Sequence, residues 1–245
     1  MAKNQGTQSQ ASFVKQCSSF VNSVAGLDLS LRLIQAVAQV VSEVFIDGLV
    51  SKRCSVAAFQ LALARRYLRF FSFIDCLDRV TTLSNFDTRS WGSASHTLEV
   101  VEASCLGAYF ALEDLTMLHD MDVLRVSWYT PILVEANKFW FYAICASLAR
   151  NLGELLTGSF QEAESAKVHA EGQKAESTTT ERTPQRASRV QLLQRLVIDS
   201  CDITLPTSFI GWVALGDLQV GLAMIVSSLL AWPALWVAAQ QRGRD

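Results

Sequence analysis

The stretch AAFQLALARRYLRFFSFIDCLDRV, residues 57–80, decides the fold class of this chain, because its apolar and basic residues recur with the period of an α-helix. At about 100° per residue, the large apolar side chains fall on one face. Arg65, Arg69 and Arg79 lie on the opposite arc. The pattern therefore predicts a single amphipathic helix. Its apolar face carries Phe59, Leu63, Tyr67, Phe70, Ile74 and Leu77, with Phe71 at its margin.

A bilayer surface suits this arrangement, since aromatic rings sit at the depth of the lipid headgroups and guanidinium groups meet lipid phosphates. The expected partner is a phospholipid membrane with anionic headgroups. A helix that packs its apolar face on a protein core gives the same pattern, so both interpretations stay open. Under the membrane interpretation, the lipid-contacting residues are Arg65, Arg66, Tyr67, Arg69, Phe70, Phe71 and Ile74.

The composition favours a membrane-associated protein over a nucleic-acid-binding one. Of the 245 residues, 50% are apolar and only 18% are charged. The mean hydropathy is +0.23, which is high for a soluble domain. The net charge of -2 argues against nucleic acid as a partner, because nucleic-acid binding normally needs a basic excess over the domain.

Motifs for catalysis or metal binding are missing from the sequence. The six cysteines are dispersed and form no C-x-x-C pair, which favours reduced thiols over a zinc site or a redox motif. There is no phosphate-binding glycine loop, nucleophile elbow or H-E-x-x-H pair. His119 with Asp120 and Asp122 resembles a site, but its place at an expected helix end favours capping. We therefore expect no enzyme, no catalytic residue, no metal and no cofactor.

Helical periodicity continues on both sides of the opening stretch. Gly48 is expected to end one helix, and Thr130 followed by Pro131 is typical of the start of another. Gly153 or Gly158 would end that later helix. The fold class is therefore all-α, a membrane-associated bundle of amphipathic helices with an apolar, membrane-spanning helix at the C-terminus. The other expected helices are residues 13–24, 28–47, 98–118 and 187–200.

Two apolar runs bear on how the chain meets a membrane. Residues 139–149 are too few to cross a bilayer, so we expect a core or interfacial helix there. Residues 209–230 are numerous enough and carry a single charge, at Asp217, which is costly in hydrocarbon unless it is protonated, paired or near the interface. Tryptophans at both ends, Trp212 and Trp232, fit an aromatic belt. We expect residues 209–230 to span, with a buried core helix as the alternative.

The chain is expected to divide into three regions. Residues 1–157 form an N-terminal region of amphipathic helices. Residues 158–188 are polar and nearly free of large apolar side chains, so they are expected to be a disordered linker. Residues 189–245 form a C-terminal helical region that contains the membrane segment.

Four segments together carry a resemblance to a known family. The resemblance covers most of residues 13–158 and 189–230 and leaves the polar linker unmatched. In order and spacing these segments resemble the fungal branch of the peroxin-11 family. They are ALARRYLRFFSFIDCLDRV at 62–80, ALEDLTMLHDMDV at 111–123, ILVEANKFWFYAICASL at 132–148 and DLQVGLAMIVSSLL at 217–230.

This resemblance implies a non-enzymatic protein of the peroxisomal membrane, which elongates and constricts the organelle in proliferation and fission. It implies that the helix around Arg66 and Phe70 inserts among lipids, and that the partners are further copies of the chain, other family members and fission machinery. Arg66 near the apolar edge and the acidic Asp75 and Asp78 depart from an ideal inserting helix. A metabolite pore is the alternative function, although it needs several spans where the sequence predicts one. A soluble helical adaptor would need residues 209–230 to be core.

Overall fold

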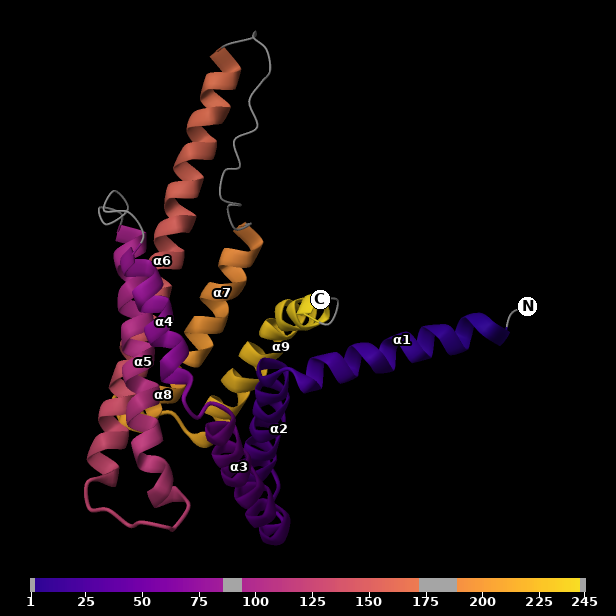
Figure 1. Ribbon diagram of the computed structural model, residues 1–245, viewed down its shortest axis with the longest axis vertical. Coiled ribbons are helices and arrows are strands. Elements are labelled where there is room, and N and C mark those ends of the chain that lie inside the picture. Colours follow the sequence, from indigo (N-terminus) through magenta and orange to yellow (C-terminus); the bar gives the residue numbers. More distant parts are fainter. Residues whose placement is uncertain (1–2, 86–93, 172–188, 243–245) are drawn as a thin grey trace.

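The computed structural model describes residues 3–85, 94–171 and 189–242, and within these ranges the chain forms helices and no strand (Figure 1). The all-α prediction is confirmed. The helices are α1 (Lys3–Asn22), α2 (Val24–Val44), α3 (Gly48–Leu68), α4 (Ser72–Asn85), α5 (Ala94–Asp120), α6 (Tyr129–Glu171), α7 (Arg189–Asp202), α8 (Thr204–Ile210) and α9 (Asp217–Arg242).

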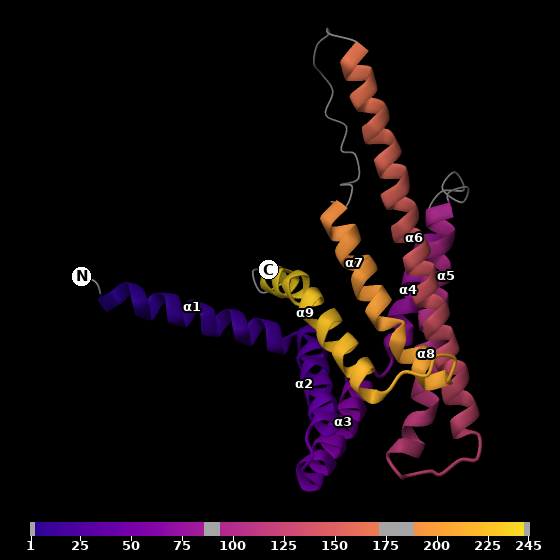
Figure 2. The ribbon, with the colours of Figure 1, turned by 180° about the vertical axis from the view of Figure 1, so that it is seen from behind.

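The helices gather in two groups. In one, α5 lies along α6 and α4 lies along α5; in the other, α2 packs on both α3 and α9. Helix α7 contacts α6 and α9 and so joins the groups (Figures 1 and 2). Helix α1 projects sideways from the second group in both views. Helix α3 meets α5 over a short contact only, and the candidate site lies there.

The stretch expected to be one helix is broken in the middle. Helix α3 ends at Leu68 and α4 starts at Ser72. Between them Phe71 has a left-handed backbone conformation, with φ of 68°, which is uncommon for a residue with a Cβ. The Phe71 N–H donates to the Asp114 carboxylate of α5 at 3.0 Å. The prediction of a single helix was therefore wrong, because a tertiary contact holds the chain in a turn there.

Glycine proved a poor guide to the helix ends. Gly48 does not end α2 but starts α3, because Asp47 caps that helix by accepting a hydrogen bond from the Leu49 N–H at 2.9 Å. Helix α6 starts at Tyr129, close to the predicted start, but runs past Gly153 and Gly158 to Glu171. One glycine inside a helix costs only about 1 kcal/mol, and packing on α5 offsets that.

Helix α6 extends into the segment that was expected to be the linker. Its last turns cover residues 158–171, where the linker was expected to begin, and residues 172–188 lie outside the described part of the chain. The division into three regions stays a prediction. Helix α6 ends inside the polar segment, at Glu171, and not before it.

Three helices of the described chain are long and apolar enough to cross a membrane: Val24–Val44, Tyr129–Thr157 and Asp217–Gln241. The expectation of one span, with a core or interfacial helix around residues 139–149, stays a prediction beside these three candidates. The apolar run 209–230 is also not one helix, because α8 ends at Ile210 and α9 starts only at Asp217. Asp217 lies in the first turn of α9, where the helix dipole favours a carboxylate.

Helices α2 and α9 run antiparallel and hold the second group together. At one end, the Phe20 ring lies 4.7 Å from the Trp232 ring and 5.2 Å from the Trp236 ring, centroid to centroid. At the other end, the Gln39 amide donates to the Asp217 carbonyl oxygen at 2.9 Å. The start of α2 and the end of α9 therefore lie on the same side of the molecule.

Candidate membrane-contact site

The seven residues expected to contact lipid lie together where α3 passes into α4, a segment called here the junction, residues 65–74. Basic residues in the last turn of α3 suit the negative end of that helix. The chain then turns through hydrogen bonds from the N–H groups of Arg69 and Phe70 to the carbonyl oxygens of Arg66 and Tyr67. The turn separates the junction side chains into two sets.

One set is apolar and exposed. The exposed fraction is 57% for Phe71 and 53% for Ile74, against 42% for both Tyr67 and Phe70. The rings of Phe70 and Phe71 meet edge to face, with centroids 4.3 Å apart. Leu77, one turn further along α4, is also exposed. We call these five side chains the junction patch. Exposed apolar groups on this scale typically mark a surface that contacts a partner or a membrane.

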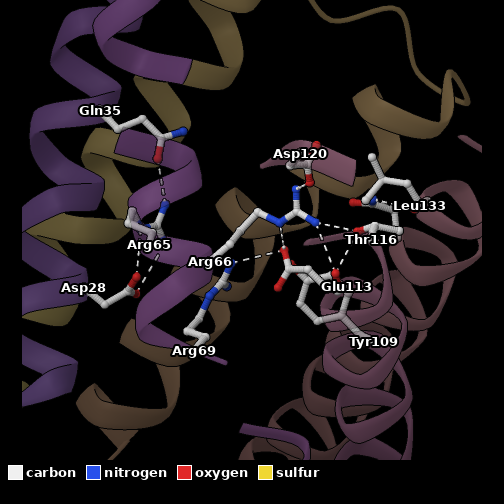
Figure 3. A network of polar contacts seen from close by, with 11 residues as sticks. Asp28, Gln35, Arg65, Arg66, Arg69, Tyr109, Glu113, Thr116, Asp120 and Leu133 are labelled. Carbon is white, nitrogen blue, oxygen red and sulfur yellow. Dashed lines mark hydrogen bonds and ion pairs between the residues drawn. The ribbon is translucent and has the colours of Figure 1, made fainter. Parts of the chain in front are cut away.

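The second set, the three arginines, turns inward instead. The Arg66 guanidinium forms ion pairs with two carboxylates of α5, those of Asp120 and Glu113, the latter at 3.3 Å. It also donates to the Thr116 hydroxyl at 2.6 Å and to the Glu113 carbonyl oxygen at 3.3 Å (Figure 3). Only 13% of the Arg66 side chain is exposed. Arg66 thus fastens the end of α3 to α5.

Arg69 shares the Glu113 carboxylate, at 3.4 Å. Its guanidinium carbon also lies 5.7 Å from the centre of the Phe110 ring, within reach of a cation–π interaction. Glu113 accepts a further hydrogen bond from the buried Tyr109 hydroxyl at 2.9 Å. Burial opposes the charge on Arg69, but its interactions with Tyr109 and with the Glu113 carboxylate outweigh burial and raise the pKa of Arg69. Arg69 therefore stays charged in its enclosed position.

Arg65 turns to the other neighbour of α3. Its Nε and Nη2 donate to the Asp28 carboxylate of α2 at 2.9 and 3.3 Å, and its Nη1 donates to Gln35 at 3.0 Å. Burial lowers the pKa of Arg65, and the Asp28 charge opposes this shift. Figure 3 shows Arg65 directed to α2 while Arg66 and Arg69 are directed to α5. The arginines therefore join three helices.

A cavity of about 600 Å³ lies beside these ion pairs, between the three apolar helices and α3 and α5. A further arginine of α2, Arg32, lines it and pairs with Asp202 of α7. The four lining arginines face four lining carboxylates, those of Asp28, Glu113, Asp202 and Asp217. The cavity wall is therefore formally balanced in charge.

The acidic partners are the residues that the sequence did not reveal. Glu113 is only 6% exposed, and the Asp114 carboxylate accepts a hydrogen bond from the Phe71 N–H of the junction. A signal was present, since Glu113 and Asp120 are two helical turns apart and so lie on one face of α5. His119 lies in the last turn of α5, where its Nδ1 accepts a hydrogen bond of 3.0 Å from the Val126 N–H in the turn beyond the helix. Within the described ranges, no group of three or more His, Cys, Asp or Glu side chains could hold a metal ion.

The lipid contact of the seven junction residues stays a prediction, and it now applies to its members differently. Tyr67, Phe70, Phe71 and Ile74 are exposed as that role requires. Arg65, Arg66 and Arg69 have intramolecular carboxylate partners in this conformation.

Comparison with known proteins matches this sequence to a family. The family model described as Peroxisomal biogenesis factor 11 (PEX11) matches residues 14–236. A relative, the Peroxisomal membrane protein PMP27 of Saccharomyces cerevisiae, is 24% identical over 223 residues, which cover 89% of this chain and 92% of the relative. No solved structure matches the chain. Since the family model spans nearly the whole chain, including α2, the junction, α6 and most of α9, this chain belongs to the peroxisomal biogenesis factor 11 family.

Proposed function

We infer that this chain remodels the peroxisomal membrane, elongating it during proliferation and before fission. The chain is a peroxisomal membrane protein with a role in peroxisome proliferation, as its family and its yeast relative indicate. The structural observation that carries the finer proposal is the junction patch, five exposed apolar side chains next to helices that can span a bilayer.

The mechanism we propose is a wedge. Side chains of the junction patch enter the headgroup region of one leaflet and expand it relative to the other. Full burial of a large apolar side chain contributes about 1.5–3 kcal/mol, and each patch side chain, already about half buried, gains roughly half of that. One copy bends a membrane little, so the proposal requires many copies side by side, either of this chain or of other family members. Fission machinery then acts on the elongated membrane, and no step requires catalysis by this chain.

The two other functions considered have less support. A soluble adaptor does not need three helices long enough to cross a membrane. A pore needs several spans, and three are available, but it also needs a polar passage with free ligand groups. In the central cavity, Arg32 and Arg65 are paired with Asp202 and Asp28 instead. We therefore make no proposal of transport.

Imaging of peroxisomes in cells that lack the native protein tests the wedge. The variant Phe70→Ser/Phe71→Ser/Ile74→Ser should reach peroxisomes but fail to restore their number and elongation. The matched control is Val190→Ser/Leu193→Ser, which removes apolar side chains that are 70% and 50% exposed on α7. The control should restore both. Full restoration by the triple variant would rule out the junction patch as the wedge.

A further inference from the structure

The junction is docked on one short part of α5, between Phe110 and Asp120. Arg66 pairs with Asp120 and Glu113, and Arg69 pairs with Glu113 and lies over Phe110. The backbone is held as well, because Asp114 accepts a hydrogen bond from the N–H of Phe71. Three carboxylates of α5 therefore hold the segment that carries the exposed rings.

Carboxylate and phosphate compete for the same groups of an arginine. A guanidinium offers N–H donors in a planar fork that fits either anion. Arg66 is 13% exposed and Arg69 is 23% exposed, so neither can pair with a lipid phosphate while Glu113 and Asp120 hold it. A carboxylate of α5 and a lipid phosphate therefore cannot pair with the same arginine at the same time.

The surrounding packing allows the junction to move without taking the fold apart. Helix α3 packs chiefly on α2, and its contact with α5 is short. Helix α4 has its own packing on α5, where the Cys76 Cβ lies close to Gly107. Exchange of the ion pairs would therefore free the junction while both neighbouring helices stay in place.

We propose that Glu113, Asp114 and Asp120 form an acidic clamp that competes with anionic lipid phosphate for the junction. This rests on the proposed function and names its regulation. Facing a neutral membrane, the clamp holds Arg66 and Arg69 and keeps the rings at the surface of the protein. Facing an anionic membrane, lipid phosphates replace the carboxylates on both arginines, and the junction patch enters the leaflet.

The test uses the full chain in proteoliposomes of phosphatidylcholine with increasing phosphatidylserine. A small environment-sensitive fluorescent amino acid replaces Ile74, an exposed residue in the first turn of α4. A blue shift with quenching by brominated lipid reports insertion of the junction. The native chain should insert only once phosphatidylserine is present. Glu113→Gln should lower the phosphatidylserine fraction at half-maximal insertion by about fivefold, the effect of freeing one basic side chain at an anionic surface. Asp114→Ala, which releases the Phe71 N–H, should also lower this fraction.

Glu99→Gln is the matched control, since it removes one carboxylate from the same helix at a site that pairs with the more exposed Arg79. It should insert like the native chain. Asp114 is on the surface of α5, so Asp114→Ala tests the clamp even where Glu113→Gln does not fold, which far-ultraviolet circular dichroism reveals.

The outcomes separate the clamp from the wedge. Equal half-maximal fractions for the native chain, Asp114→Ala and Glu99→Gln would overturn the clamp and leave the wedge standing. Insertion of the native chain into phosphatidylcholine alone would also overturn the clamp. A label that stays in water in every chain and every lipid mixture would overturn the wedge itself.

Discussion

Arg66 and Arg79 are two arginines of one sequence stretch with very different surroundings. Arg66 is enclosed between Glu113 and Asp120, while Arg79 pairs with Glu99 at 2.9 Å with 43% of its side chain exposed. Burial decides what such a pair contributes, because removing one partner of a buried pair leaves the other charge without solvation. An exposed pair leaves both partners in water.

Arg66→Ala should therefore lower the free energy of unfolding by about 3 kcal/mol, and Arg79→Ala by less than about 1 kcal/mol. Denaturant titration of both variants in detergent micelles measures the difference. Equal losses would mean that the Arg66 ion pairs do not hold α3 to α5.

Asp199 of α7 gives a prediction about pH. Burial raises the pKa of Asp199, although hydrogen bonds from Ser147 and Asn151 act against the shift. The folded state thus binds this proton more tightly than the unfolded chain. The contribution of Asp199 to stability is most favourable below the ordinary carboxyl pKa and declines as the pH rises through the raised folded value.

Asp199→Asn, which keeps an oxygen for both hydrogen bonds, should accordingly be more stable than the native chain at pH 7. The gain should shrink as the pH falls into the acidic range where Asp199 is protonated. Thermal unfolding at a series of pH values follows it. A gain that is the same at every pH would show that ionisation of Asp199 is not its cause.

At the scale of the elements, two glycines test what ends a helix in this chain. Gly211 follows α8 in a left-handed conformation with φ of 84°, whereas Gly153 lies inside α6, and neither has an atom near the position of an added Cβ. Only the backbone conformation therefore distinguishes them.

Gly211→Ala should destabilise the chain by about 1–2 kcal/mol, the strain of a Cβ in the left-handed region. Gly153→Ala should stabilise it by about 0.5–1 kcal/mol through a better helix propensity. The shift in melting temperature of each variant is the measurement. Destabilisation by Gly153→Ala would indicate an unseen neighbour at that position.

At the scale of the whole molecule, the antiparallel packing of α2 and α9 places the start of α2 beside the end of α9. The Ser19 hydroxyl, just before α2, donates to the Ala239 carbonyl oxygen near the end of α9 at 2.9 Å. With α2 and α9 as the two spans, and α6 not crossing, the two termini belong on one side of the membrane.

Tags placed at the N-terminus and at the C-terminus should therefore be cleaved, or protected, together when protease is added to intact peroxisomes. A tag in the turn between α2 and α3, at Ile46, should behave in the opposite way, since that residue is fully exposed at the far end of α2. Cleavage of one terminal tag with protection of the other would exclude this arrangement.

The sequence by itself determined the all-α class, the membrane character and the position of the amphipathic stretch that carries the expected lipid-contacting residues. These depend on local quantities, the period of apolar residues and the apolar length of a segment, which any stretch of chain carries with it. Even so, the start of the C-terminal apolar helix was placed eight residues too early, at 209 instead of 217, because apolar length does not show where Gly211 breaks a helix.

Only the tertiary structure decided which way the arginines point and where the amphipathic stretch breaks. Arg66 pairs with Asp120, 54 positions away, and Phe71 bonds Asp114, 43 positions away. A periodic pattern places Arg66 and Phe70 on faces of one helix, but it holds no information about the carboxylates that another helix brings to them. Partners for buried charges are set by packing, because enclosing a charge is favourable only where the fold supplies its counter-charge.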